Sequence, residues 1–139
     1  MRVSTTISFS LLSAILPLAV SAAPFEFNMT APAVDLEKRA FDNARLTYYD
    51  ITTGVTACGG TYSNSAQVVA LNGEQFGSGY PGPYCGKEIR ITANGKTYNA
   101  NIVDKCPGCP YAGLDLTEGL FSEFASLDVG VLTGSWDYV

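Results

Sequence analysis

Two stretches in the second half of the chain alternate between apolar and polar residues, with a two-residue turn between them. The apolar positions are Ile89, Ile91 and Ala93 in residues 87–93, and Tyr98, Ala100 and Ile102 in residues 96–103. Such alternation places apolar side chains on one face of a strand. Asn94-Gly95 between the runs is the strongest short signal for a hairpin. The pattern therefore predicts a β-hairpin with one buried face.

Shorter runs predict the remaining strands. Residues 45–50 are rich in aromatic and β-branched side chains, which favour strands. Residues 68–71 form an apolar run between polar segments, as a buried strand does. We expect residues 129–132 and 135–139 to form two closing strands. The chain thus contains about six short strands.

One helix is predicted at residues 117–126. Thr117 can cap its first turn, and Glu118 follows where the helix dipole favours negative charge. Leu120, Phe121 and Phe124 lie on one helical face, and we expect them in the core. Six short strands, one short helix and long connections indicate a mainly β protein, and favour a small closed barrel over a sandwich.

The first part of the 139-residue chain is predicted to be removed. An apolar run at 11–20 follows Arg2 and ends near small residues, so residues 1–22 resemble a secretory signal peptide, too short for a membrane span. Residues 23–39 are rich in Ala and Pro and end in Lys38-Arg39, which predicts a pro-segment cut after the basic pair, although an exposed charge pair in a linker would look the same. Residues 40–139 suffice for one small domain.

Charge and histidine content exclude several functions. Residues 40–139 hold five basic and ten acidic residues, so their net charge is −5. An acidic domain without a basic stripe is a poor nucleic-acid binder, and we expect neither nucleic acid nor membrane as a partner. The chain has no histidine, which removes Ser-His-Asp and Cys-His catalysis and the commonest metal ligand. We expect no cofactor and no metal.

The four cysteines are expected to form disulfides, because the chain is small and carries a secretory leader. Four cysteines allow three pairings, and we favour Cys58 with Cys85 and Cys106 with Cys109. A zinc site at the C-P-G-C turn lacks a second C-x-x-C pair. A redox pair would precede a helix directly, whereas here the helix begins only after Asp115.

The run from Ile102 to Thr117 carries the candidate chemistry. The apolar pair Ile102-Val103 precedes Asp104, and Leu114 and Leu116 flank Asp115. Alternation therefore turns the Asp115 carboxylate away from the leucines. We expect the two acids to face the same solvent region from the two ends of one cross-linked loop. Each acid taken alone could instead serve a turn or a helix terminus.

These motifs resemble a known family over residues 45–139. Their order is similar to that of secreted single-domain rare lipoprotein A-like proteins, particularly the expansin-related fungal loosenins. The matching motifs are T-Y-Y-D at 47–50, A-C-G-G at 57–60, V-V-A-L at 68–71, C-G-K-E-I at 85–89, V-D-K-C-P-G-C at 103–109, L-D-L-T at 114–117 and S-W at 135–136. The resemblance implies a six-stranded double-psi β-barrel that binds and loosens cell-wall polysaccharide without hydrolysis.

The resemblance also implies site residues. Asp115 corresponds to the essential aspartate of the expansin H-F-D motif, although Gly113 and Leu114 replace its neighbours. Asp104 matches a second aspartate of the expansin groove. Thr47 and Tyr49 fall near the family's groove threonine and tyrosine. We therefore expect a shallow groove for cellulose or chitin, lined by these residues and by tyrosines such as Tyr111, whose rings suit sugar faces.

Two rival functions remain open. Related family-45 endoglucanases place a general base in T-x-Y-x-D, and Asp50 ends a motif one residue shorter, so Asp50 could pair with Asp115 in an inverting mechanism. We prefer the interpretation that Asp50 starts a turn, and expect a non-hydrolytic protein. Some rare lipoprotein A-like proteins instead inhibit papain-type cysteine proteases or act as effectors, a role that exposed loops such as 77–84 and 107–113 would serve.

Overall fold

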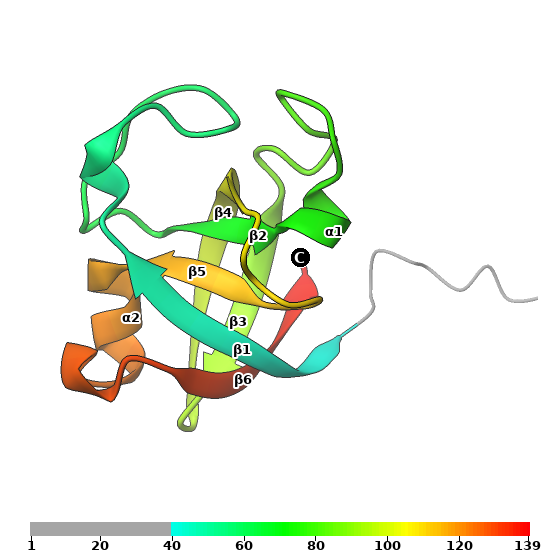
Figure 1. Ribbon diagram of the computed structural model, residues 1–139. Helices are drawn as coiled ribbons and strands as arrows, with labels where there is room; N and C mark the ends of the chain where they lie inside the picture. The colour runs from blue at the N-terminus through cyan, green and yellow to red at the C-terminus, as the bar shows by residue number, and fades with distance from the viewer. Residues whose placement is uncertain (1–39) are drawn as a thin grey trace, which may run out of the picture. The chain divides into compact units, whose positions relative to one another are not determined.

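The computed structural model describes residues 40–139, which form a six-stranded barrel (Figure 1). The signal peptide, pro-segment and basic pair expected over residues 1–39 lie outside the described residues. The strands are β1 (Phe41–Tyr49), β2 (Val68–Asn72), β3 (Glu88–Ala93), β4 (Lys96–Cys106), β5 (Leu114–Thr117) and β6 (Leu132–Tyr138). They close in the order β1-β5-β2-β4-β3-β6, which confirms the mainly β barrel. Within residues 40–139, no helix has the length and apolarity needed to cross a membrane.

Parallel and antiparallel pairs alternate irregularly around the barrel. β1 runs parallel to β5 and β2 runs parallel to β4, while β2–β5, β3–β4, β3–β6 and β1–β6 are antiparallel. Parallel neighbours need long crossover connections, which explains the long loops in so short a domain. Figure 1 shows β1, β5 and β2 side by side, although they are distant in sequence.

The predicted hairpin is confirmed. Asn94 and Gly95 have φ of 49° and 72°, the positive values that a tight two-residue turn requires. In β3 the buried positions alternate with exposed ones, and Ile89 and Ile91 have no exposed surface. Ile102 on β4 is equally buried. The apolar side chains of both strands therefore enter the barrel core, as their alternation predicted.

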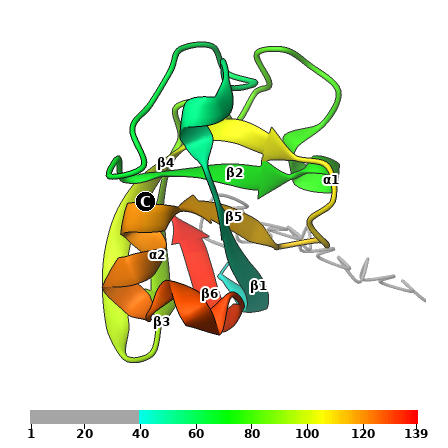
Figure 2. The same cartoon turned by 60° about the vertical axis from the view of Figure 1, so that its left-hand side comes forward.

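The predicted helix is also confirmed, as α2 (Glu118–Phe124). The Thr117 side chain accepts a hydrogen bond from the backbone N–H of Leu120, which satisfies a donor at the helix terminus. Phe121 and Phe124 are buried in the main core. Beside α2, the structure has one four-residue helical turn, α1 (Gly73–Phe76), directly after β2. Figure 2 shows α2 packed beside the lower part of the barrel.

The prediction of two closing strands is wrong. Val129 belongs to a 3₁₀ turn at Leu127–Val129, and one strand, β6, covers residues 132–138 without a break. Gly134 lies inside this strand and pairs with Ala44 of β1. A Cβ at Gly134 would come within 2.6 Å of the Thr92 carbonyl oxygen. This glycine therefore permits close approach of neighbouring backbones, a role that the sequence pattern could not separate from a turn.

β1 begins at Phe41, earlier than the sequence indicated. The Phe41 ring stacks on Trp136 with centroids 4.2 Å apart, and this contact holds the start of β1 against β6. Trp136 itself is buried, as expected for the closing strand, and its indole N–H donates to the Ala112 carbonyl. The tryptophan thus joins the strand to the loop that precedes β5.

Both favoured disulfides are present. Cys58 bonds to Cys85 and Cys106 bonds to Cys109. The first spans 27 residues and joins the loop after β1 to the loop before β3. Closing a loop of that length removes unfolded-state entropy worth about 3 kcal/mol. The second closes the tight turn at the end of β4.

Replacing Gly134 with alanine should destabilise the barrel. The added Cβ would approach Thr92 O at 2.6 Å and Leu46 Cδ1 at 2.8 Å, so the strands must move apart. Overpacking of this kind costs roughly 1–3 kcal/mol, which urea unfolding would measure. Gly54→Ala is the matched control, since nothing lies within 4 Å of a Cβ there. Equal stability of the two variants would contradict this account of β6.

Candidate functional site

Four strands place the candidate acids on one face. Thr47 on β1 pairs with Asp115 on β5, Asp115 pairs with Ala70 on β2, and Ala70 pairs with Asp104 on β4. Paired residues point to the same side of a sheet, so these four side chains form one row. Their chain neighbours Leu46, Leu114 and Leu116 are in the core, so the row lies on the outer face. With neighbouring strands about 4.8 Å apart, the two aspartates are roughly 10 Å apart at their Cα atoms.

Asp115 is held by Thr47. The Thr47 hydroxyl donates to Asp115 Oδ1 at 2.6 Å, and the Asp115 side chain is half-buried. Burial raises the pKa of Asp115 above its usual range, and the negative charge of Asp104 adds to the rise. The Thr47 hydrogen bond and the positive charge of Arg45 oppose the rise without cancelling it. The carboxyl group therefore takes up a proton more readily than an exposed aspartate does.

The carboxylate oxygens of Asp104 accept hydrogen bonds from within the protein. Its Oδ1 accepts the backbone N–H groups of Ala57 at 2.8 Å and Lys105 at 2.9 Å. Its Oδ2 accepts the Tyr49 hydroxyl at 2.9 Å. The Tyr49 ring packs against a small apolar cluster formed by Ile51, Val68 and Val103. Asp104 thus fixes the position of the tyrosine and anchors the loop that contains Ala57.

Tyr49 remains a hydrogen-bond donor. Burial of the ring raises the pKa of its hydroxyl far above the usual range, and the hydrogen bond to Asp104 and the charges of Asp104 and Asp115 raise it further. The phenol therefore stays protonated throughout the physiological range. The charges of both aspartates act on the Tyr49 hydroxyl, so Tyr49 is coupled electrostatically to each of them.

Asp50 caps a turn. It is exposed and precedes a 3₁₀ turn at Ile51–Thr53, where its Oδ1 accepts the Thr52 backbone N–H at 3.0 Å and hydroxyl at 2.6 Å. The Asn64 side-chain amide donates to the same oxygen at 3.0 Å. These hydrogen bonds hold the pKa of Asp50 below its usual value, the Thr52 hydroxyl most strongly. This geometry accounts for the residue without a catalytic role.

Tyr111 belongs to a different group of rings. It is 57% exposed and meets the Phe41 ring edge-on, with centroids 6.2 Å apart. Phe41 in turn packs against Trp136 and Tyr138. The contacts of the described residues thus join Tyr111 to β1 and β6, whereas Thr47, Tyr49, Asp104 and Asp115 are linked to one another.

Arg45 is a member of the acidic face that the sequence patterns did not indicate. It lies two residues before Thr47 on β1, so its side chain leaves the strand on the same side, and it is exposed. Its charge acts on Asp115. The alternation within residues 45–49 could have placed Arg45 beside Thr47 and Tyr49.

The disulfide at 106–109 borders the same face. An oxygen of Asp115 lies within 4.8 Å of both sulfur atoms, close enough in principle for three metal ligands. Both sulfurs are bonded to each other, however, so the carboxylate faces a disulfide and not a pair of thiolates. The disulfide therefore forms one border of the site.

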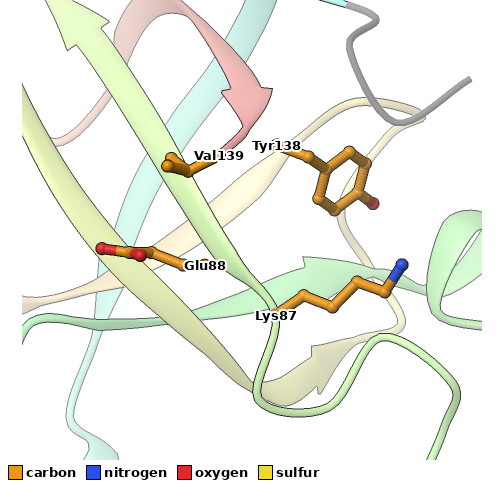
Figure 3. A pocket seen from close by; sticks show the side chains of 4 residues that line it. All are labelled: Lys87, Glu88, Tyr138 and Val139. Atoms are coloured by element: carbon orange, nitrogen blue, oxygen red, sulfur yellow. The ribbon is translucent and has the colours of Figure 1, made fainter. Parts of the chain in front are cut away.

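A separate pocket lies between β3 and β6, outside the four strands of the acidic face. Lys87, Glu88, Tyr138 and Val139 line it (Figure 3). Figure 3 shows the Lys87 side chain extending toward the Tyr138 ring. The Lys87 ammonium lies 5.6 Å from that ring's centroid and 5.3 Å from the Tyr84 centroid. The candidate aspartates take no part in this pocket.

Solved structures define the class of protein. The Clavibacter michiganensis expansin, solved in complex with cellohexaose, superposes with a TM-score of 0.63 over 73% of this chain and 50% of that chain, at 23% identity. A solved structure of the Streptomyces papain inhibitor superposes with a TM-score of 0.66 over 73% of this chain and 94% of that chain, at 31% identity. The fold is therefore the double-psi β-barrel that expansins share.

Sequence comparison identifies the family. The papain inhibitor of Streptomyces mobaraensis is 34% identical over 100 residues, which cover 68% of this chain and 69% of that protein. The chain belongs to the same family as this inhibitor. Allergen Asp f 7 of Aspergillus fumigatus is 41% identical over 97 residues, and the chain spans only about a third of that protein and of its Arthroderma benhamiae homologue. No protein-family model matches the chain.

The raised pKa of Asp115 predicts a pH-dependent effect of Asp115→Asn. Below the usual carboxyl pKa both folded and unfolded forms hold the proton; as pH rises, the unfolded chain loses it first, so the wild type loses stability through the folded pKa. Asparagine keeps an acceptor for Thr47 and carries no such loss. We expect the free energy of unfolding of the variant, relative to wild type, to be higher at pH 7 than at pH 3 in urea titrations.

Asp128→Asn, at an exposed aspartate of the turn before β6, controls for the removal of one negative charge. A stability difference between Asp115→Asn and wild type that stays constant from pH 3 to pH 7 would show that burial does not shift the Asp115 carboxyl.

Proposed function

We propose that the protein is a secreted, loosenin-like binder of cell-wall polysaccharide that separates chains without hydrolysing them. The observation that carries this proposal is the row of Thr47, Asp115, Ala70 and Asp104 on the outer face of four strands. Two disulfides and the expected leader support an extracellular or cell-wall location.

The two aspartates of the row have different roles. Asp104 already accepts three hydrogen bonds, so it acts as a positioning residue for Tyr49. Asp115 accepts one from Thr47 and keeps acceptor capacity for sugar hydroxyls. Arg45 beside it can donate to the same sugar. A carboxylate, a hydroxyl and a guanidinium on one face suit a polyhydroxylated chain, because charge-assisted hydrogen bonds are the strong ones.

Hydrolysis is not supported by the placement of the acids. An inverting glycosidase needs a protonated acid and a separate base about 6.5–9.5 Å apart with a water between them. The raised pKa of Asp115 would suit the acid. Asp50, however, is used by Thr52 and Asn64 as a cap, and Asp104 is used by Tyr49 and two backbone amides. We therefore propose binding without bond cleavage.

Asp115→Ala should weaken binding to cellulose or chitin and abolish filter-paper weakening while the barrel stays folded. Losing a charge-assisted hydrogen bond of about 1.5 kcal/mol or more raises the Kd roughly tenfold. A pull-down on both polysaccharides measures this, with Asp128→Ala as the control that removes an exposed carboxylate elsewhere. Unchanged binding by the Asp115 variant would reject the role of the acidic face, and release of reducing sugar from soluble glucan by the wild type would reject the non-hydrolytic mechanism.

A second candidate function is inhibition of a papain-type cysteine protease. The observation in its favour is family membership with the Streptomyces mobaraensis papain inhibitor, together with the superposition on 94% of a solved Streptomyces papain inhibitor. Inhibition does not need the acidic face, so the two functions can be separated. A papain assay with the wild type, run beside the polysaccharide pull-down, decides between them.

A further inference from the structure

Two loops extend from the same end of the barrel. Residues 54–60 follow the first 3₁₀ turn, and residues 77–84 follow α1; we call them together the two-loop surface. Both views show them standing above β2 (Figures 1 and 2). The disulfide between Cys58 and Cys85 joins their bases. Loops far apart in sequence are thereby held at a fixed distance from each other.

Each loop presents one large apolar side chain to solvent. Val55 is 74% exposed and Tyr80 is 66% exposed, the two highest values among the exposed large hydrophobic residues of the described chain. A single exposed apolar residue is ordinary in a folded protein. Two of them on loops that a disulfide joins form a surface on which an interface can be built.

The residues of the two loops carry no charge in an acidic protein, and the charged group that contacts Gly77 and Tyr80 is the Lys105 ammonium of β4. Between Ile51 and Gly86 the chain has one charged residue, Glu74, which belongs to α1 and to neither loop. The domain as a whole carries a net charge of −5. The cores of protein–protein interfaces are depleted in charged residues and enriched in tyrosine. The charge pattern therefore separates this surface from the acidic face of Asp115.

Val55 stands on an ordered turn. Its neighbour Thr56 is buried, and the Thr56 hydroxyl donates to the Gly59 carbonyl at 3.0 Å. The Thr56 backbone N–H donates to the Gly60 carbonyl at 3.1 Å. These hydrogen bonds close the turn on itself, so little conformational entropy is lost when Val55 meets a partner.

Tyr80 is supported from below. The Lys105 ammonium lies 5.4 Å from its ring centroid and donates to the Gly77 carbonyl at 2.6 Å. The buried Phe76 ring contacts Tyr80 with centroids 6.2 Å apart. A cation and an aromatic ring thus hold the tyrosine from the protein side and leave most of the residue in solvent. An exposed, pre-positioned tyrosine is the kind of residue that contributes most at interfaces.

We propose, resting on the second candidate function, that the two-loop surface enters the active-site cleft of a papain-type cysteine protease and blocks access of substrate. Two projecting loops match a concave partner, since enzyme sites are clefts. Val55 offers no hydrogen bond to sugar hydroxyls, and exposed apolar area without charge suits the core of a protein–protein interface. Inhibition is steric and needs no bond to the protease.

Tyr80→Ala and Val55→Asp test the surface in steady-state inhibition of papain. We expect Tyr80→Ala to raise the inhibition constant about thirtyfold or more, as loss of an interface hot spot does, and Val55→Asp to raise it at least about tenfold. Tyr80→Phe keeps the ring and should stay within about threefold of wild type. Urea unfolding of each variant checks that the barrel remains intact.

A matched control separates this surface from the rest of the molecule. Val129→Asp places the same charge at another exposed valine and should inhibit papain as the wild type does. Equal inhibition by wild type and both loop variants would overturn the surface while leaving the inhibitor function standing. Absence of papain inhibition by the wild type would instead refute the function on which the surface rests.

Discussion

The acidic face and the two-loop surface both depend on the hydrogen bonds that the Asp104 carboxylate accepts. It accepts hydrogen bonds from Tyr49 on β1, from Ala57 in the loop after β1, and from the backbone of Lys105 on its own strand. One side chain therefore connects the acidic face to the base of the two-loop surface. Hydrogen bonds to a charged acceptor are stronger than neutral ones, and losing a partly buried acceptor leaves several donors unsatisfied. Asp104 thus anchors Tyr49 and the loop that contains Ala57.

The molecule separates charge from apolar exposure. Asp115, Thr47 and Arg45 gather on the outer face of β1 and β5, while Val55 and Tyr80 stand on uncharged loops. A sugar chain is bound through hydrogen-bonding groups, whereas a protein cleft is bound through apolar area without charge. The chain belongs to the family of the papain inhibitor and shares its barrel with expansins.

Local signals predicted most of the barrel, and partly the site. The hairpin predicted over 87–103, the buried strand predicted over 68–71 and the helix predicted over 117–126 are present as β3 with β4, β2 and α2. They could be predicted because turn chemistry and apolar periodicity act within a few residues. The closing strand was misread at Gly134, because a glycine that permits close packing looks the same in sequence as one that makes a turn. The Tyr111 ring contacts Phe41, a neighbour that the sequence did not single out, and its place in a polysaccharide groove stays a prediction. Side-chain contacts between distant elements leave no such local signal.

By itself the sequence determined the alternation of buried and exposed residues, the acidic balance, the absence of histidine, and the resemblance that pointed to Asp104 and Asp115. Only the tertiary structure decided which partners these residues have. It placed Ala70 between the two acids, gave Asp104 three donors and Asp115 one, and used Asp50 as a cap. The reason is that a strand pattern fixes which side a residue faces, whereas its hydrogen-bond partners come from strands that closure of the barrel brings alongside.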